Sequence, residues 1–344
     1  MKIGIVSVYK THNCGSFLQA YALKRILVDM NHDVYFVPYN MFANSLLDVL
    51  FQCFKSFLKC RFNFVNFMFR RYLAFRCLIK EHFQRSTSWK SCDLFIFGSD
   101  TLWNFEDPFF LQRKKFFLGN WTSKKKIAFS VSVGSSDYLK FLSDNVIVNG
   151  LKNFHQISVR DIYSLDFVKH LSKRDDLLET IDPTMLLKPE DYSFGNETMP
   201  KGGFVFVYHF GKCSDKLQKE ITFFAANKQI RIINMGSPIA FADENVTNDP
   251  FKFLQYIKNA DYVFTNTFHG CIFSILFNKQ FVTDGFAKKK IETLLIKFRL
   301  EDRILYVDNE FTPKMELPIE YKSVNICIEN YRKKSLAFLT DNLN

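Results

Sequence analysis

Residues 263–274 read Val-Phe-Thr-Asn-Thr-Phe-His-Gly-Cys-Ile-Phe-Ser, which predicts a buried strand, a small-residue turn and an apolar helix. One histidine, His269, lies on that turn. In open α/β sheets, ligands bind beyond the carboxyl ends of the strands, at the N-termini of the helices that follow. An imidazole there can exchange a proton near neutral pH, and Gly270 allows the backbone to approach a ligand closely. A capping or packing role for His269 is the alternative that these residues leave open.

The first half of the chain supplies the strands that such a sheet requires. Ile3–Val8 is a β-branched run, and it is followed by a turn containing glycine and by a helical pattern of apolar residues. Further strands are predicted over 34–37, 94–97, 127–133, 157–159 and 178–181. Because helix-length segments separate them, they indicate a parallel sheet. Residues 1–187 are therefore predicted to form an N-terminal Rossmann-like domain.

A second series of strands and helices follows a polar segment over 188–203, which is rich in turn-forming residues and is predicted to be a linker. Strands are predicted over 204–208, 230–234, 262–265 and 281–283, and helices over 214–226, 251–258 and 272–277. Residues 204–344 are thus predicted to form a C-terminal Rossmann-like domain. We expect its last helix, over 324–339, to pack back across the two domains.

Five other short motifs precede the histidine turn in sequence order, and together with it they resemble the polysaccharide pyruvyl transferase family from Lys2 to about Leu305. They are Lys2–Val8, Thr11–Leu23, Phe97–Asn104, Ile157–Asp161 and Ile181–Leu187. Four positions depart from the family pattern. The usual Thr-Asp-Ser-Phe-His-Gly-Thr has Asn266, Thr267 and Cys271 in place of Asp, Ser and the final Thr, and Gly-Ser-Asp-Gln-x-Trp-Asn has Thr101 in place of Gln. Asn266 cannot act as an acid or a base.

This resemblance implies an α/β protein with two Rossmann-like domains facing a cleft, as in the two-domain glycosyltransferases of the GT-B type. It also implies transfer of the enolpyruvyl unit of phosphoenolpyruvate onto two hydroxyls of a hexose, which gives a pyruvate ketal and free phosphate. The acceptor would be a capsular, exopolysaccharide or cell-wall glycan precursor, free or linked to a lipid, and phosphoenolpyruvate would be a co-substrate with no further cofactor. Two alternatives remain: a sugar-nucleotide-dependent glycosyltransferase of the same architecture, and a noncatalytic glycan-binding partner.

Arg160 is the first candidate for binding the anionic donor. It follows the predicted strand 157–159 and occupies the arginine position of the family motif, and a guanidinium binds phosphate or carboxylate oxygens in a bidentate manner. The alternative is an ion pair with Asp161 or Glu179. Backbone N–H groups at Gly15, Ser16 and Gly270 are further candidates for contacts to the donor, with helix capping as the alternative. Lys289 and Lys290 lie near a basic position of the family, and Lys290 is the residue we assign to donor binding.

For proton transfer, His269 is the candidate that the family motif supports, and His12 in the first loop is the second. Asp100 follows Gly98 and Ser99 on a predicted strand-end loop. Its carboxylate is suited to orienting a sugar hydroxyl or a histidine, or else to forming a turn. Asp182 precedes Pro183, and we expect it to fix the end of a strand.

The composition excludes several other classes of protein. The formal net charge of +11 is compatible with nucleic acid, an anionic membrane or anionic substrates, but no nucleic-acid-binding motif is present, so we expect no nucleic-acid partner. The eight cysteines show no zinc-type spacing, and we expect no metal. Because the chain starts directly in a strand and has no long uninterrupted apolar run, we expect a cytoplasmic protein.

Residues 41–90 differ from the rest in being aromatic and basic with almost no acids. Interfacial membrane helices have this composition, so the segment predicts peripheral contact with the inner face of the cell membrane. The alternative is that these helices pack on the first domain with snorkelling basic side chains. The residues concerned are Phe51, Phe54, Lys55, Phe57, Leu58, Lys59, Arg61, Phe62, Phe64, Phe67, Met68, Phe69, Arg70, Arg71, Phe75 and Arg76.

Overall fold

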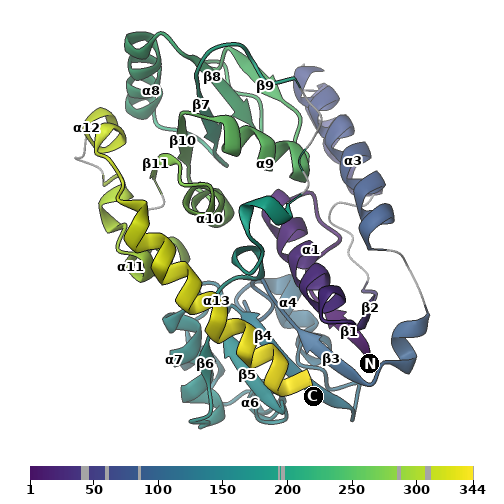
Figure 1. Cartoon of the computed structure of the whole chain (residues 1–344). Coiled ribbons are helices and arrows are strands. Elements are labelled where there is room, and N and C mark those ends of the chain that lie inside the picture. Colours follow the sequence, from purple (N-terminus) through teal and green to yellow (C-terminus); the bar gives the residue numbers. More distant parts are fainter. Residues whose placement is uncertain are drawn as a thin grey trace.

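Two parallel sheets form the framework of the computed structural model, which describes residues 1–39, 46–58, 62–83, 87–192, 194, 198–284, 288–306 and 311–343 (Figure 1). The first sheet has the strand order β2-β1-β3-β4-β5-β6. Its strands are β1 (Lys2–Val6), β2 (Asp33–Phe36), β3 (Leu94–Phe97), β4 (Lys125–Val131), β5 (Gln156–Val159) and β6 (Leu178–Glu179). The second sheet has the order β11-β10-β7-β8-β9. It consists of β7 (Phe204–Tyr208), β8 (Arg231–Met235), β9 (Glu244–Val246), β10 (Tyr262–Thr265) and β11 (Gln280–Thr283).

The strands β3 and β7 are apolar along their whole length, as expected where helices cover both faces of a parallel sheet. The side chains of β3 and β7 are all buried. The predicted strands over 94–97, 204–208 and 262–265 are confirmed to the residue, and the bounds of the others differ by one or two residues at one or both ends. β9 was not predicted because Glu-Asn-Val is a short polar run at the edge of the sheet.

The helices that follow these strands begin at side-chain caps. Asn13 caps α1 (Cys14–Asp29), Asp161 caps α7 (Ile162–Ser172) and Thr267 caps α10 (Phe268–Leu276). The remaining α-helices are α2 (Leu46–Leu58), α3 (Phe62–His82), α4 (Pro108–Gln112), α5 (Lys114–Phe117), α6 (Asn145–Lys152), α8 (Asp215–Lys228), α9 (Pro250–Asn259), α11 (Lys289–Phe298), α12 (Phe311–Glu316) and α13 (Tyr321–Leu343). Short 3-10 helices lie at Ser88–Ser91, Tyr138–Phe141, Pro183–Met185, Pro189–Asp191 and Glu301–Arg303.

Two helices join the halves of the molecule. Phe17 of α1 contacts Phe251 of α9 at a ring distance of 6.0 Å, and the largest apolar cluster contains residues from both halves. The long helix α13 returns from the second half to the first, as predicted: Ile181 N donates to Ser335 Oγ at 3.0 Å, and Arg332 Nε donates to Met185 O at 2.9 Å (Figure 1). The predicted linker falls between β6 and β7, although its residues 193 and 195–197 lie outside the described residues.

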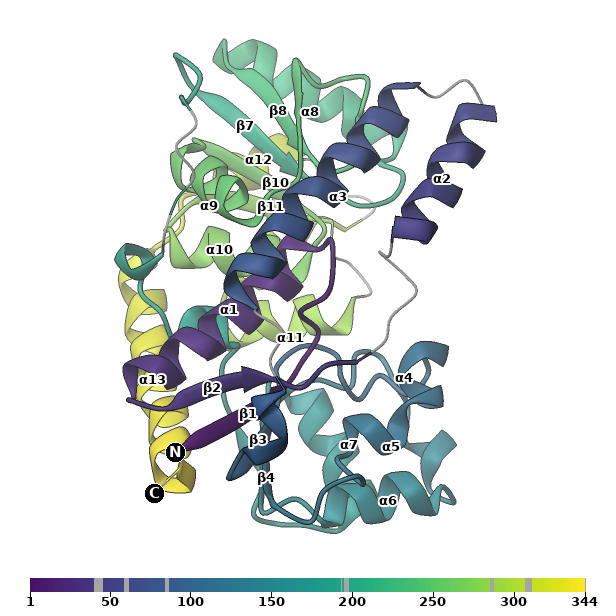
Figure 2. The same ribbon diagram turned by 90° about the vertical axis from the view of Figure 1, so that its right-hand side faces the viewer.

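The helices α2 and α3 account for most of the aromatic, basic segment (Figure 2). α3 runs along the outside of α1, and α2 packs mainly on α3. Residues 41–45, 59–61 and 84–86 of this segment lie outside the described residues. Of the helices that the structure describes, none is both long enough and apolar enough to cross a bilayer.

Candidate functional site

A cavity of about 230 Å³ lies where the carboxyl edges of the two sheets meet. The segments after β1, β3 and β5 contribute Ser16 of α1, Asp100 and Arg160 to its wall. The segments after β10 and β11 contribute His269 and Lys290 from the opposite side. The strand order reverses at β1 in the first sheet and at β7 in the second, and ligands of open α/β sheets bind at such switch points. Five candidates chosen from the sequence therefore line one cavity.

His269 is the second residue of α10 and its side chain is nearly buried. Its Nε2 lies 3.5 Å from Asp182 Oδ2. The ring also packs against the first turn of α1, where a Cβ added to Gly15 would lie 2.1 Å from His269 Nδ1. Gly15 therefore permits a contact between the two halves of the protein that no larger residue would allow.

Gly270 does not lie on a turn, because α10 already begins at Phe268. A Cβ at Gly270 would lie 2.2 Å from Thr265 Oγ1 and 2.6 Å from Thr267 Oγ1. Gly270 therefore allows its backbone to lie close to these two threonines, and not to a ligand as the sequence suggested. It brings the start of α10 tightly against the end of β10, which fixes the position of His269.

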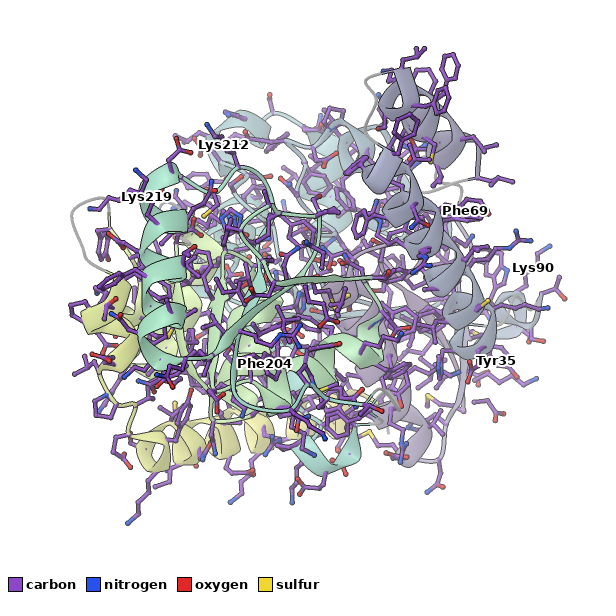
Figure 3. All side chains as sticks on the ribbon, turned by 90° about the horizontal axis from the view of Figure 1, so that it is seen from above. Tyr35, Phe69, Lys90, Phe204, Lys212 and Lys219 are labelled. Carbon is purple, nitrogen blue, oxygen red and sulfur yellow. The ribbon has the colours of Figure 1, made fainter. Side chains whose placement is uncertain are left out.

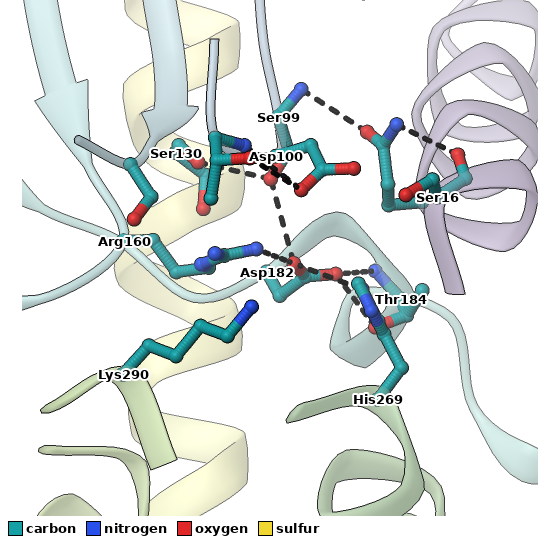
Figure 4. Close-up of polar contacts among 12 residues, drawn as sticks. Ser16, Ser99, Asp100, Ser130, Arg160, Asp182, Thr184, His269 and Lys290 are labelled. Carbon is teal, nitrogen blue, oxygen red and sulfur yellow. Dashed lines mark hydrogen bonds and ion pairs between the residues drawn. The ribbon is translucent and has the colours of Figure 1, made fainter. Parts of the chain in front are cut away.

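Asp182 connects the donor-binding candidate Arg160 to the catalytic candidate His269 (Figure 4). Its Oδ2 accepts from Arg160 Nη1 at 2.9 Å and from Ser99 Oγ at 3.4 Å. Its Oδ1 accepts from Thr184 Oγ1 at 2.7 Å and from Thr184 N at 3.0 Å. Burial by itself opposes ionisation, but His269, Arg160 and Thr184 outweigh it and hold the pKa of Asp182 well below its usual range. Asp182 lies beyond the end of β6 and caps the 3-10 helix Pro183–Met185, so it does not fix the end of a strand as expected.

Arg160 is almost fully buried, and its partner is Asp182. The alternative pairing with Asp161 or Glu179 is wrong. Asp161 accepts from Ser164 N as the cap of α7, and Glu179 pairs with Lys297 at 2.7 Å. The guanidinium stacks on the ring of Phe268 at 4.1 Å, and its Nε is buried with no partner among the described residues.

The three lysines at the start of α11 point in different directions. Lys290 lines the cavity, whereas Lys289 Nζ lies over the ring of Tyr163 at 4.3 Å. Lys288 Nζ donates to Asn266 O at 2.8 Å. Burial, reinforced by the neighbouring cations Arg160 and Lys288, lowers the pKa of Lys290. No acceptor for the Lys290 ammonium is found in the described part of the chain, and Figure 4 shows it directed toward Arg160 and Asp182.

Asp100 makes a local turn contact and also lines the cavity. Its Oδ1 accepts from Thr101 N at 2.8 Å, which is a local turn contact. Its backbone has a left-handed φ of 74°, which asparagine and aspartate tolerate better than most residues. The residue nevertheless lines the cavity, so its carboxylate is available beside the cations.

Other candidates lie elsewhere or are already engaged. His12 packs on Tyr72 and Phe75 of α3 with ring distances of 5.7 and 5.5 Å, and burial together with Arg71 lowers its pKa to about 4. The N–H groups of Gly15 and Ser16 donate to Asn13 Oδ1 at 2.9 and 3.1 Å. The N–H of Gly270 donates to Thr267 Oγ1 at 2.9 Å. These N–H groups are therefore used to cap α1 and α10, which is the alternative role named in the sequence analysis.

Asn266 has a structural role that explains its side chain. Its Oδ1 accepts from Phe210 N at 2.9 Å, and its Nδ2 donates to Phe210 O at 2.7 Å. An amide provides both a donor and an acceptor, whereas an ionised carboxylate only accepts. The same Nδ2 lies 3.0 Å from Nε2 of His209, a residue without any motif signal, which contacts Asp284 Oδ2 at 3.0 Å. Asn266 thus fastens the loop after β7 to the end of β10.

The charges around the cavity favour a small anion. Arg160, Lys288 and Lys290 line it together with a single carboxylate, Asp100. Within the described ranges, no group of three or more His, Cys, Asp or Glu side chains is placed to hold a metal ion. The arrangement offers cations for phosphate or carboxylate oxygens, an imidazole for proton transfer and a carboxylate that can accept from hydroxyls.

Residues 13–283 match the family model for polysaccharide pyruvyl transferase, which covers most of the chain. No curated protein matches the sequence. The fold is similar to that of the UDP-GlcNAc 2-epimerase from Neisseria meningitidis, with a TM-score of 0.54, 9% identity, and coverage of 100% of this chain and 99% of that one. The corresponding epimerase from Methanocaldococcus jannaschii gives a TM-score of 0.53 and 10% identity, and covers 95% of this chain and 93% of its own. These likenesses confirm the two-domain fold of the GT-B type.

Proposed function

Since the chain belongs to the polysaccharide pyruvyl transferase family, we propose that it moves the enolpyruvyl unit of phosphoenolpyruvate onto two hydroxyls of a hexose. The products are a cyclic pyruvate ketal and inorganic phosphate. The acceptor is a precursor of a surface polysaccharide or of a cell-wall glycan. What supports this donor most directly is the cavity at the strand ends, where the ammonium of Lys290 and the guanidinium of Arg160 converge beside His269.

Donor binding rests on electrostatics. Phosphoenolpyruvate carries a carboxylate and a phosphate, and charge-assisted hydrogen bonds to such groups are stronger than those between neutral partners. Lys290 has no acceptor of its own among the described residues, so an incoming anion supplies one. Arg160 has one N–H engaged by Asp182, and its buried Nε is without a partner. Asp182 therefore orients the guanidinium while the remaining N–H groups bind the donor.

The chemistry requires one proton to be delivered to carbon and two to be removed from oxygen. His269 donates a proton to the methylene carbon, which becomes the methyl group and leaves an oxocarbenium-like centre at the adjacent carbon. One acceptor hydroxyl adds there and loses its proton, the phosphate departs with the electron pair of its C–O bond, and the second hydroxyl adds. Of the two hydroxyl protons, one restores His269 and the other leaves with the phosphate as hydrogen phosphate.

The neighbours of His269 suit this proton transfer. Asp182 faces Nε2 and stabilises the imidazolium, as an orienting carboxylate does for an acid–base histidine. Asp100 lies on the opposite wall of the cavity, where its carboxylate accepts a hydrogen bond from the acceptor sugar. The phosphate charge that develops on departure is balanced by Lys290 and Arg160.

The proposal is tested by measuring phosphate release from phosphoenolpyruvate with a panel of free and lipid-linked glycans. We expect release only when an acceptor is present, and we expect the product to gain the mass of a pyruvate ketal. UDP-sugars serve as competing donors in the same panel. Transfer or stabilisation with a UDP-sugar, and none with phosphoenolpyruvate, would assign the protein to the glycosyltransferases instead. Glycan binding without phosphate release would identify a noncatalytic partner.

A further inference from the structure

The outer face of α2 is apolar although it is exposed. Leu46, Leu50 and Phe54 follow one another at a spacing of four residues, which places them on one side of the helix. Phe54 is 60% exposed and Leu58, four residues further, is 66% exposed. The opposite side, with Val49 and Ser56, is buried instead. Exposed apolar patches of this kind are typical of surfaces that contact a membrane or another molecule.

The exposed stripe continues onto α3. Phe57 of α2 and Phe62 of α3 are in ring contact at 5.5 Å, and both are more than half exposed. Phe69 and Leu73 extend the same stripe along α3, with 44% and 43% of their surface exposed. Figure 3 shows Phe69 on the outer side of the molecule, away from the second sheet. We call the set Leu46, Leu50, Phe51, Phe54, Phe57, Leu58, Phe62, Phe69 and Leu73 the apolar stripe.

Basic side chains border the apolar stripe. Lys55 is exposed on α2, where its Nζ lies over the ring of Phe51 at 4.2 Å. Arg70, Arg76 and Lys80 are exposed on α3. The described residues of these two helices contain only two acids, Asp48 and Glu81. Aromatic side chains beside cations, with few acids, are the composition of helices that lie in the interface of an anionic bilayer.

We propose that α2 and α3 dock the protein on an anionic membrane surface, with the apolar stripe entering the interface and the basic residues contacting lipid phosphates. This goes beyond the transfer reaction and does not depend on it. The charge complementarity favours lipid over a second copy of the chain, because two such surfaces would place their cations face to face.

The docking surface is connected to the cavity. Tyr72 and Phe75, on the inner side of α3, pack against the ring of His12. His12 precedes Asn13, which lines the cavity. The helix α3 therefore lies between the apolar stripe and the loop that carries Asn13 into the cavity wall. If the proposed function holds, this position gives the site access to an acceptor whose lipid carrier remains in the bilayer.

Cosedimentation with vesicles tests the inference. One set consists of phosphatidylcholine alone and the other of phosphatidylcholine mixed with phosphatidylglycerol. We expect binding to the mixed vesicles at low salt, little binding to phosphatidylcholine alone, and weakening as salt is raised. The double variant Phe54→Ser/Phe57→Ser should bind at least about tenfold more weakly because it removes two interfacial rings. Lys55→Gln and Arg76→Gln should each weaken binding about fivefold.

Matched controls lie on α8, on the far side of the molecule. Phe223 is 62% exposed, and Lys219, also exposed, is labelled on the side opposite Phe69 in Figure 3. Phe223→Ser and Lys219→Gln remove the same groups and should leave vesicle binding unchanged. The inference is overturned by an absence of binding to anionic vesicles at low salt, or by equal losses in the α2 and α8 variants. It is also overturned if ultracentrifugation shows a dimer that Phe54→Ser/Phe57→Ser dissociates. Phosphate release with a water-soluble glycan should be unchanged in all these variants, so failure of docking and failure of the proposed reaction are separable.

Discussion

The strand-end cavity and the apolar stripe both depart from the usual placement of side chains, but in opposite ways. Beside the cavity, Asp182 and Arg160 are charged and buried, whereas Phe54 on α2 is apolar and exposed. The buried charges are offset within the chain, because Asp182 has Arg160, His269 and Thr184 as partners. Phe54 has no such compensation among the described residues. We therefore expect the residues of the first region to contribute to both stability and function, and those of the second to contribute little to stability.

The largest effect is expected at His269, to which we assign the proposed proton transfer. His269→Ala should lower turnover by about 10² to 10⁴ while donor affinity changes far less. His269→Gln should not restore it, because an amide cannot exchange a proton at neutral pH. Steady-state kinetics, donor titration and thermal unfolding of both variants distinguish proton transfer by His269 from orientation and from a packing role. If Gln recovers most of the activity, the histidine orients rather than transfers, and if Ala retains near wild-type turnover the catalytic assignment is wrong.

Asp182→Asn should produce the largest loss of stability. Removing one member of a buried ion pair leaves Arg160 uncompensated and costs about 3 to 5 kcal/mol. Because the folded-state pKa of Asp182 is depressed, its contribution is present above the usual carboxyl range and is lost as pH falls below it. Urea unfolding across acid pH should show this loss in the wild type and a flatter profile in the variant.

The comparison variant is Phe54→Ser, which changes a larger side chain but an exposed one. Its free energy of unfolding should stay within about 0.5 kcal/mol of the wild type. Similar losses of unfolding free energy in Asp182→Asn and Phe54→Ser would show that the two regions do not differ in their contribution to stability. The helix α2 would then contribute to the folded core.

His12 connects the two regions and should make the protein sensitive to mild acid. Its pKa is lowered from 6.5 to about 4, so the unfolded chain takes up the proton first as pH falls. Stability should therefore decrease between these two values, by about 3 kcal/mol in total. The slope of unfolding free energy against pH should flatten in His12→Gln. An unchanged slope would show that His12 is not the group responsible.

Lys290 should affect donor affinity rather than folding. Lys290→Gln should weaken phosphoenolpyruvate binding by about 1.5 to 3 kcal/mol, whereas Lys289→Gln, which changes net charge equally, should not. Because a bound anion stabilises the protonated amine, wild-type affinity should fall as pH rises through the lowered pKa of Lys290. Calorimetric titration of the wild type and both variants with phosphoenolpyruvate, carried into alkaline pH, measures these affinities. Equal affinities of the wild type and Lys290→Gln would exclude Lys290 from the donor site.

Much of the site follows from local sequence patterns. Apolar runs such as 204–208 and 262–265 define central strands, and residues directly after such strands share one edge of a sheet. That rule brings Arg160 and His269 to one cavity, whereas Lys290, which lies in α11, is assigned from the resemblance to the family. The resemblance to the family supplied the order of these motifs, which periodicity alone does not reveal.

The remaining contacts depend on how the two halves meet. Nothing near Asp182 indicates that it pairs with Arg160, 22 residues away, or with His269 of the other half. Likewise, Gly15 and His269 each stand out in the sequence, yet only the packed helices α1 and α10 show that one accommodates the other. Such non-local pairs are set by tertiary packing, which overrides local preference.

Transfer carried out in deuterium oxide tests the central claim most directly. The reaction uses phosphoenolpyruvate and the glycan that supports the fastest phosphate release, and the product is analysed by mass spectrometry. If an exchangeable group such as His269 protonates the methylene carbon, each pyruvate ketal should carry one solvent-derived deuterium in its methyl group. Ketal formed without deuterium would contradict proton delivery by His269, and a glycan that gains a sugar in place of pyruvate would contradict pyruvyl transfer itself.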